Sequence, residues 1–192
     1  MSHSPNSPRL DIPVLDTISP ALVRKTITTC ERLLTSSNPI PLVLSREWAR
    51  RFPTEAGVYA VFDNGTLIYL GETGSLSARM ADFLDSRNHV LRRSLGNALF
   101  KDMDGFRRAS AHERFPDHIE VRINEYIESQ LTAAAVVVPL GRAEIEEQLA
   151  GKYRPPYNSK GKRGTKLYEN ASNRGQAMTS VVGSYRRAER TV

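Results

Sequence analysis

The feature that most constrains the fold is a tight-turn signal between two short apolar runs. Asp63-Asn64-Gly65 is a turn of the kind that closes a β-hairpin. Gly57-Val58-Tyr59 opens the run before it, and Tyr69-Leu70-Gly71 closes the run after it. The sequence therefore predicts two hairpin strands that bring Tyr59 and Tyr69 within reach of each other. Both triplets contain a glycine, a residue beside which the backbone can approach a ligand closely.

Length and composition predict a single domain with additional material at its ends. The chain has 192 residues, of which 40% are hydrophobic, enough for a core. No apolar run approaches the length of a membrane span, and the N-terminus lacks the apolar middle of a signal peptide. The single cysteine, Cys30, excludes an internal disulfide and a cysteine-based zinc cluster. A cytoplasmic location is therefore the expectation.

The positive charge of the chain is concentrated at its C-terminal end. The formal net charge is +6, and the segment from residue 159 onward has eight basic residues against two acidic ones. This segment therefore carries the whole excess. Basic tails bind phosphate backbones through counterion release, without reading sequence. We expect the tail to contact nucleic acid; the alternative is a solubilising segment.

Composition and periodicity divide the chain into four segments. Residues 1–18 are predicted to be flexible, 19–54 to form a helical arm, 55–159 to form the main domain and 160–192 to be a basic tail. Within the arm and the domain, several further elements are expected beside the hairpin. They are helices over 19–36, 76–84, 89–101, 119–129 and 142–153, and a buried strand over 131–140.

Three polar residues after the hairpin suggest phosphodiester chemistry. Arg79 lies about one turn into its predicted helix, where a guanidinium can fork onto two phosphate oxygens. Glu146 precedes Asn158 by twelve residues, across a Pro-Pro break that folds the asparagine back toward the helix. A carboxylate can hold a divalent cation, and a cation with an arginine can neutralise developing phosphoryl charge. One carboxylate with water as the remaining ligands suits Mg²⁺.

Taken in chain order, the two hairpin triplets and the motifs around Arg79, Glu146 and Asn158 resemble those of the GIY-YIG endonucleases. The resemblance covers roughly residues 55–159, about half the chain. The segment from His89 to Gly96 also resembles a stretch found in many small bacterial members. The matching elements are Gly57-Val58-Tyr59, Tyr69-Leu70-Gly71, Gly71-x4-Leu76-x2-Arg79, Glu146-x2-Leu149 and Pro155-x-Tyr157-Asn158.

The resemblance implies an α+β domain with a small, mostly antiparallel sheet of three strands flanked by helices. It also implies DNA cleavage with one divalent ion, Mg²⁺ with Mn²⁺ as a substitute, held by Glu146. Arg79 would grip the scissile phosphate, and Asn158 would brace the site from behind. An alternative from another class is a catalytically silent DNA-binding module that kept the fold.

The resemblance also assigns roles to the aromatic residues of the site. Tyr59 would act as general base or water-positioning group, and Tyr69 would support it by hydrogen bonding. His89 would contact the phosphate or relay protons. Some members carry a histidine four residues past the helix arginine, but this chain has Phe83 there. Either His89 takes over that role or the role is absent.

The DNA contacts and the biological role are further expectations. A restriction enzyme, which would favour a homodimer on palindromic sites, and a structure-selective repair or recombination nuclease rank about level, with a homing enzyme below both. Arg92 and Arg93 are expected on an exposed helix face. The residues predicted to contact DNA are Arg92, Arg93, Lys160, Lys162, Arg163 and Lys166.

Overall fold

The computed structural model describes residue 8 and residues 20–36 and 38–158 of the chain. Most of the predicted N-terminal segment and all of the basic tail, with Lys160, Lys162, Arg163 and Lys166, lie outside the described residues. Among the described residues, no helix is both long and apolar enough to cross a membrane.

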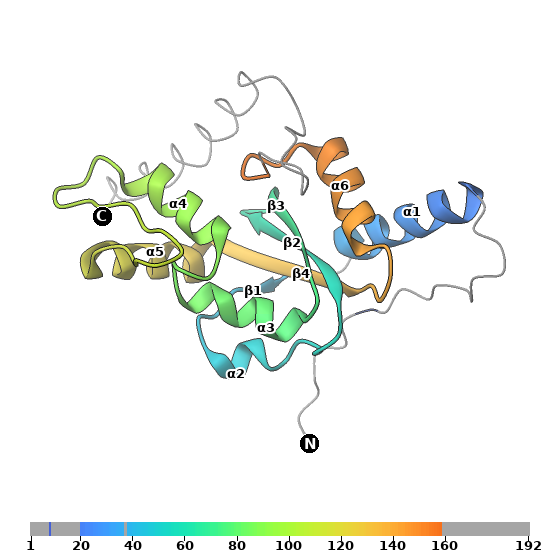
Figure 1. The fold of residues 1–192 in the computed structure, drawn as a ribbon, viewed down its shortest axis with the longest axis horizontal. Coiled ribbons are helices and arrows are strands. Elements are labelled where there is room, and N and C mark those ends of the chain that lie inside the picture. The colour runs from blue at the N-terminus through green and yellow to red at the C-terminus, as the bar shows by residue number, and fades with distance from the viewer. Residues whose placement is uncertain (1–7, 9–19, 37, 159–192) are drawn as a thin grey trace.

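A single antiparallel sheet forms the centre of the fold (Figure 1). Its strands are β1 (Ile40–Pro41), β2 (Gly57–Asp63), β3 (Thr66–Thr73) and β4 (Leu131–Val137), in the order β1-β4-β2-β3. The α+β prediction is confirmed, but the predicted count of three strands is wrong by one. The additional strand, β1, has only two residues and contains a proline, so no alternation in the sequence reveals it.

The β2–β3 hairpin forms as predicted. Asp63 pairs with Thr66, so Asn64 and Gly65 are the two loop residues, with φ of 47° and 79°. Positive φ at both positions is the geometry that favours Asn-Gly in such turns. The register shifts between Val61 and Phe62, a β-bulge that increases local twist. On the far side of the bulge from the turn, Tyr59 pairs with Gly71 and Val61 pairs with Tyr69, so the two tyrosines lie diagonally across the strand pair.

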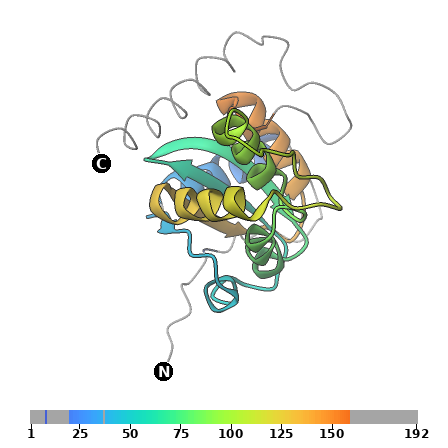
Figure 2. The ribbon, with the colours of Figure 1, turned by 90° about the vertical axis from the view of Figure 1, so that its left-hand side faces the viewer.

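Helices cover both faces of the sheet (Figures 1 and 2). The helices α1 (Pro20–Ser36) and α6 (Arg142–Tyr153) enclose one core, which contains Cys30. The opposite core includes the T-shaped pair of Trp48 and Phe52, with ring centroids 4.9 Å apart. It is covered by α2 (Arg46–Ala49), α3 (Leu76–Ala81), the short 3₁₀ helix η1 (Asp82–Leu84), α4 (Val90–Phe100) and α5 (Asp117–Gln130).

One surface prediction is wrong. Arg92 was expected on the exposed face of its helix, but its residue is only 1% exposed. Its guanidinium forms an ion pair with Glu120, which is 3% exposed. A buried side chain cannot contact a DNA backbone, so Arg92 is removed from the predicted DNA contacts. Its neighbour Arg93 is half-buried.

Candidate active site

The hairpin places Tyr59 directly over Gly71. The two residues are cross-strand partners in the β2–β3 pair, and Tyr59 is 1% exposed. A Cβ atom built at Gly71 would lie 2.4 Å from Cζ and 2.5 Å from the hydroxyl of Tyr59. Only glycine at position 71 therefore leaves room for the phenol in this position.

Three rings gather on this face of the hairpin. Tyr69 lies on β3 two residues before Gly71, and its ring centroid is 6.0 Å from that of Tyr59. His89, the residue that precedes α4, is fully buried, and its ring centroid is 6.1 Å from Tyr59 and 5.9 Å from Tyr69. The hydroxyl of Tyr59 and Nε2 of His89 are 3.0 Å apart and form a hydrogen bond.

Burial keeps Tyr59 and His89, which form a hydrogen bond, uncharged. Burial raises the pKa of Tyr59 well above its usual value; the nearby Tyr69 adds to this rise, and the charge of Arg79 opposes it. Burial lowers the pKa of His89 well below its usual value, and the positive charges of Arg79, Arg93 and Arg92 lower it further. Tyr59 is therefore a phenol and His89 a neutral imidazole near pH 7.

Arg79 approaches the rings from α3, a helix capped by Ser75. The Ser75 Oγ accepts from the amide of Ala78 at 3.4 Å. The side chain of Arg79 is 32% exposed, and its Nη1 donates to Asp82 Oδ2 at 2.9 Å. Its Nε is buried and has no hydrogen-bond partner among the described residues.

Glu146 and Asn158 complete the site at the free edge of β3. Asn158 Oδ1 accepts from the amide of Leu70 at 2.8 Å, and its Nδ2 donates to the Leu70 carbonyl at 2.7 Å. The same Nδ2 donates to Glu146 Oε1 at 3.2 Å. Glu146 is 8% exposed, whereas Glu144 on the same helix is exposed. Burial raises the pKa of Tyr69, and the Glu146 charge raises it further, which places the carboxylate near the aromatic rings.

The structure thus brings together the six residues predicted to be catalytic. They come from β2, β3, α3, the start of α4, α6 and the segment after α6: Tyr59, Tyr69, Arg79, His89, Glu146 and Asn158. Two contacts of the site were not predicted. Asp82 pairs with Arg79 at i,i+3 on one helical stretch, a spacing that could have revealed it. The ring of Phe83 stacks on His89, for which the sequence gives no signal.

The donor set fits a hard divalent cation with few protein ligands. Within the described ranges there is no group of three or more His, Cys, Asp and Glu residues that could hold a metal. Glu146 offers one largely buried carboxylate, held in place by Asn158. Mg²⁺ binds proteins through one or two carboxylates and retains several waters, so a single carboxylate suits it.

Comparison with known proteins finds no matching family model and no matching curated protein. The chain is similar to solved structures of the GIY-YIG N-terminal endonuclease domain of UvrC from Thermotoga maritima. A point mutant bound to its catalytic divalent cation is 25% identical, with a TM-score of 0.33, over 59% of this chain and 92% of that domain. The magnesium-bound form is 24% identical, with a TM-score of 0.31, over 59% and 93%. The motifs of this chain and their order resemble those of the GIY-YIG endonucleases, and the residues of these motifs lie on an α+β fold.

Proposed function

We propose that the chain is a metal-dependent endonuclease that hydrolyses DNA phosphodiester bonds. The observation that carries this proposal is the convergence of six residues, spread from position 59 to position 158, at the edge of one hairpin. Two tyrosines, an arginine, a histidine, a carboxylate and an amide supply the groups that phosphodiester hydrolysis requires.

Glu146 and Arg79 would stabilise charge in different ways, one through a bound cation and the other directly at the phosphate. Glu146 would hold Mg²⁺, or Mn²⁺ in its place, and Asn158 would keep the carboxylate oriented toward it. The bound cation supplies Lewis-acid stabilisation of the phosphoryl oxygens. Arg79, whose side chain is partly exposed, would donate to a phosphate oxygen, while Asp82 fixes one side of the guanidinium.

Tyr59 would position the attacking water and pass its proton onward. As a phenol, Tyr59 can accept from water through its oxygen while its own O–H donates to Nε2 of His89. When the water oxygen bonds to phosphorus and the ester P–O bond breaks, the water proton moves to Tyr59 and the Tyr59 proton passes through His89 to solvent, because the lowered pKa of the imidazole keeps it from retaining the proton. The leaving oxygen takes a proton from solvent. Tyr69 supports the Tyr59 ring from the neighbouring strand.

The experiment is incubation of plasmid DNA and short branched duplexes with Mg²⁺. Wild type is compared with Glu146→Ala and with Glu144→Ala, a matched change at an exposed position of the same helix. We expect cleavage by wild type and Glu144→Ala, and none by Glu146→Ala. Cleavage at one sequence would identify a restriction role, and cleavage at junctions or flaps a structure-selective one. Absence of metal-dependent cleavage would favour a silent DNA-binding module.

Oligomeric state and location remain predictions. A sequence-specific enzyme acting on palindromes would be a homodimer, which sedimentation of the full chain tests. The chain is also expected to act in the cytoplasm. Arg93 and the tail residues Lys160, Lys162, Arg163 and Lys166 remain the proposed DNA contacts, and binding measured against salt concentration tests them.

A further inference from the structure

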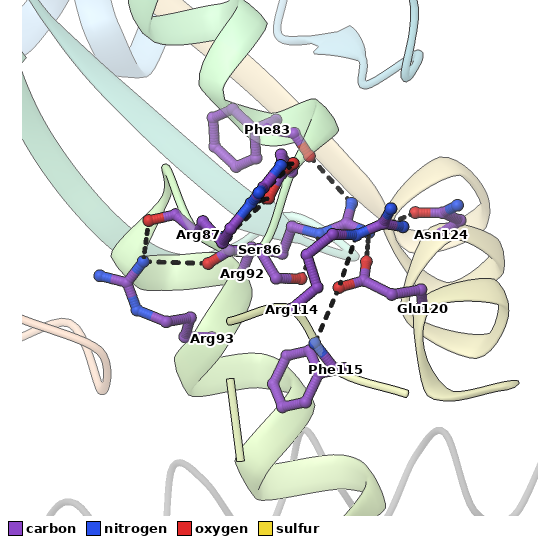
Figure 3. A network of polar contacts seen from close by, with 10 residues as sticks. Phe83, Ser86, Arg87, Arg92, Arg93, Arg114, Phe115, Glu120 and Asn124 are labelled. Carbon is purple, nitrogen blue, oxygen red and sulfur yellow. Dashed lines mark hydrogen bonds and ion pairs between the residues drawn. The ribbon is translucent and has the colours of Figure 1, made fainter. Parts of the chain in front are cut away.

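Arg92 is a buried cation that the proposed reaction does not use. Its guanidinium satisfies four acceptors at once (Figure 3). Nε donates to Ser86 Oγ at 2.8 Å, and Nη1 donates to the Phe83 carbonyl at 2.9 Å. Nη2 donates to the carboxylate of Glu120 and, at 2.5 Å, to Asn124 Oδ1. One side chain on α4 therefore connects α5 to η1 and to the segment that follows η1.

The α5 end of this network is firmly anchored. Glu120 is 3% exposed, and its Oε1 also accepts from the amide of Phe115 at 3.1 Å. Taking an ion pair out of water is costly unless the geometry is good and the remaining donors and acceptors are satisfied. Apolar residues of similar volume often stabilise such a site as well or better. The network is therefore better explained by the geometry it imposes than by stability.

The geometry it imposes is that of the segment from Phe83 to His89. Arg92 holds this segment at Phe83 and at the side chain of Ser86. The adjacent Arg93 donates from Nη1 to the carbonyls of Ser86, at 2.9 Å, and Arg87, at 2.6 Å. The two ends of the segment carry the rings that stack on each other, Phe83 and His89.

We propose that Arg92 is a positioning residue of the active site: by fixing the segment from Phe83 to His89, it holds the His89 imidazole at hydrogen-bonding distance from Tyr59. This inference rests on the proposed function only for the effect of Arg92 on cleavage. The effect of Arg92 on the His89 ring does not depend on any activity. The charged and titratable groups around that ring are Tyr59 on β2, Tyr69 on β3, Arg79 on α3, and Arg92 and Arg93 on α4.

Arg92→Lys tests the proposal, because lysine keeps the charge but cannot reach four acceptors with one planar fork. Ser86→Ala removes only the contact from Nε and leaves the pair with Glu120 intact. Arg107→Lys, at a side chain that is 72% exposed, is the matched control. We expect the single-turnover cleavage rate at saturating DNA to fall about 10- to 100-fold in Arg92→Lys, with DNA affinity unchanged. Ser86→Ala should show a smaller loss, and Arg107→Lys none.

The protonation and hydrogen bonding of the His89 ring are measured by ¹⁵N NMR of labelled histidine in the free protein. In wild type and Arg107→Lys, His89 should be neutral at pH 7, with an Nε2 shift that reports its hydrogen bond. In Arg92→Lys and Ser86→Ala that shift should move toward the value of an unbonded ring. Unchanged His89 signals in a folded Arg92→Lys variant would overturn the proposal. If Arg92→Lys does not fold, unchanged signals in Ser86→Ala would do so. If wild type cleaves no DNA, the proposed function fails, and NMR alone decides this inference.

Discussion

Phe83 stacks on the imidazole of His89, with ring centroids 3.8 Å apart and an interplanar angle of 22°. Phe83 occupies the position at which some GIY-YIG members carry a histidine. In this chain the apolar ring forms the floor on which a histidine from six residues later lies. The imidazole thus reaches Tyr59 from a different backbone position. His89 is therefore the candidate for the role that the histidine has in those members.

Tyr59→Phe should abolish cleavage while leaving DNA binding intact. The change removes the hydroxyl that contacts His89 but leaves the ring that packs over Gly71. Loss of a group that transfers protons costs about 10²- to 10⁴-fold in rate. Cleavage and binding are measured on the same duplex. Tyr126→Phe is the control, because it removes another buried hydroxyl, the donor to Asp63 Oδ2 at 2.7 Å. Full activity of Tyr59→Phe would refute the assigned role.

Gly71→Ala should be both destabilising and inactive. The added methyl group would overlap the ring of Tyr59, and overpacking of a core costs about 1–3 kcal/mol. Urea denaturation measures the loss of stability, and cleavage measures the displacement of Tyr59. Gly74→Ala provides the comparison, because a Cβ at Gly74 meets nothing within 4 Å. Equal stability of the two variants would contradict the packing described here.

Asn158→Ala should raise the Mg²⁺ concentration needed for cleavage. The variant loses the amide that holds Glu146, and loss of such an outer contact typically weakens metal affinity about 10- to 100-fold. It also loses both hydrogen bonds to the Leu70 backbone, which should lower the free energy of unfolding by about 1–3 kcal/mol. Metal titration separates the two effects. Asn38→Ala, at an exposed position, should change neither.

The segment before His89 should lose an acid-sensitive contact at low pH. Hydrogen bonds from Arg87 lower the pKa of Asp85 to about 2 from its ordinary value of 3.8. A lowered pKa in the folded protein stabilises it above pH 3.8, and the contribution disappears as the pH falls through 2. Unfolding measured between pH 5 and pH 2 should therefore show a steeper loss in wild type than in Asp85→Asn. Asp104→Asn, at an exposed position, should follow wild type.

Local chemistry made the hairpin and the site predictable. Asn64 and Gly65 specify their turn through backbone preferences that involve no distant residue, so the strands on either side follow. The resemblance of the motifs around Arg79, Glu146 and Asn158 to those of the GIY-YIG endonucleases predicted the remaining residues of the candidate site.

Other features depend on residues far away in the sequence. β1 is a strand only because Ile40 pairs with Ala133 on β4. Arg92 and Arg93 are adjacent and chemically identical, yet they project about 100° apart around the helix. The apolar spacing of Leu95 and Leu99 places Arg92 on the buried side of α4. The acceptors that let its charge be buried, Glu120 and Asn124, lie on α5, 28 and 32 residues later in the chain, and no pattern within α4 reveals them.

Asn158 forms hydrogen bonds to the edge of the sheet as well as to the Glu146 carboxylate. β3 is an edge strand, and its backbone would otherwise be open to pairing with another chain. By bonding both the amide and the carbonyl of Leu70, a single side chain imitates the residue of a neighbouring strand. The residue that orients the proposed metal ligand therefore also occupies two backbone groups of the β3 edge that another strand could pair with, next to the Ile68 carbonyl that accepts from the Tyr157 amide.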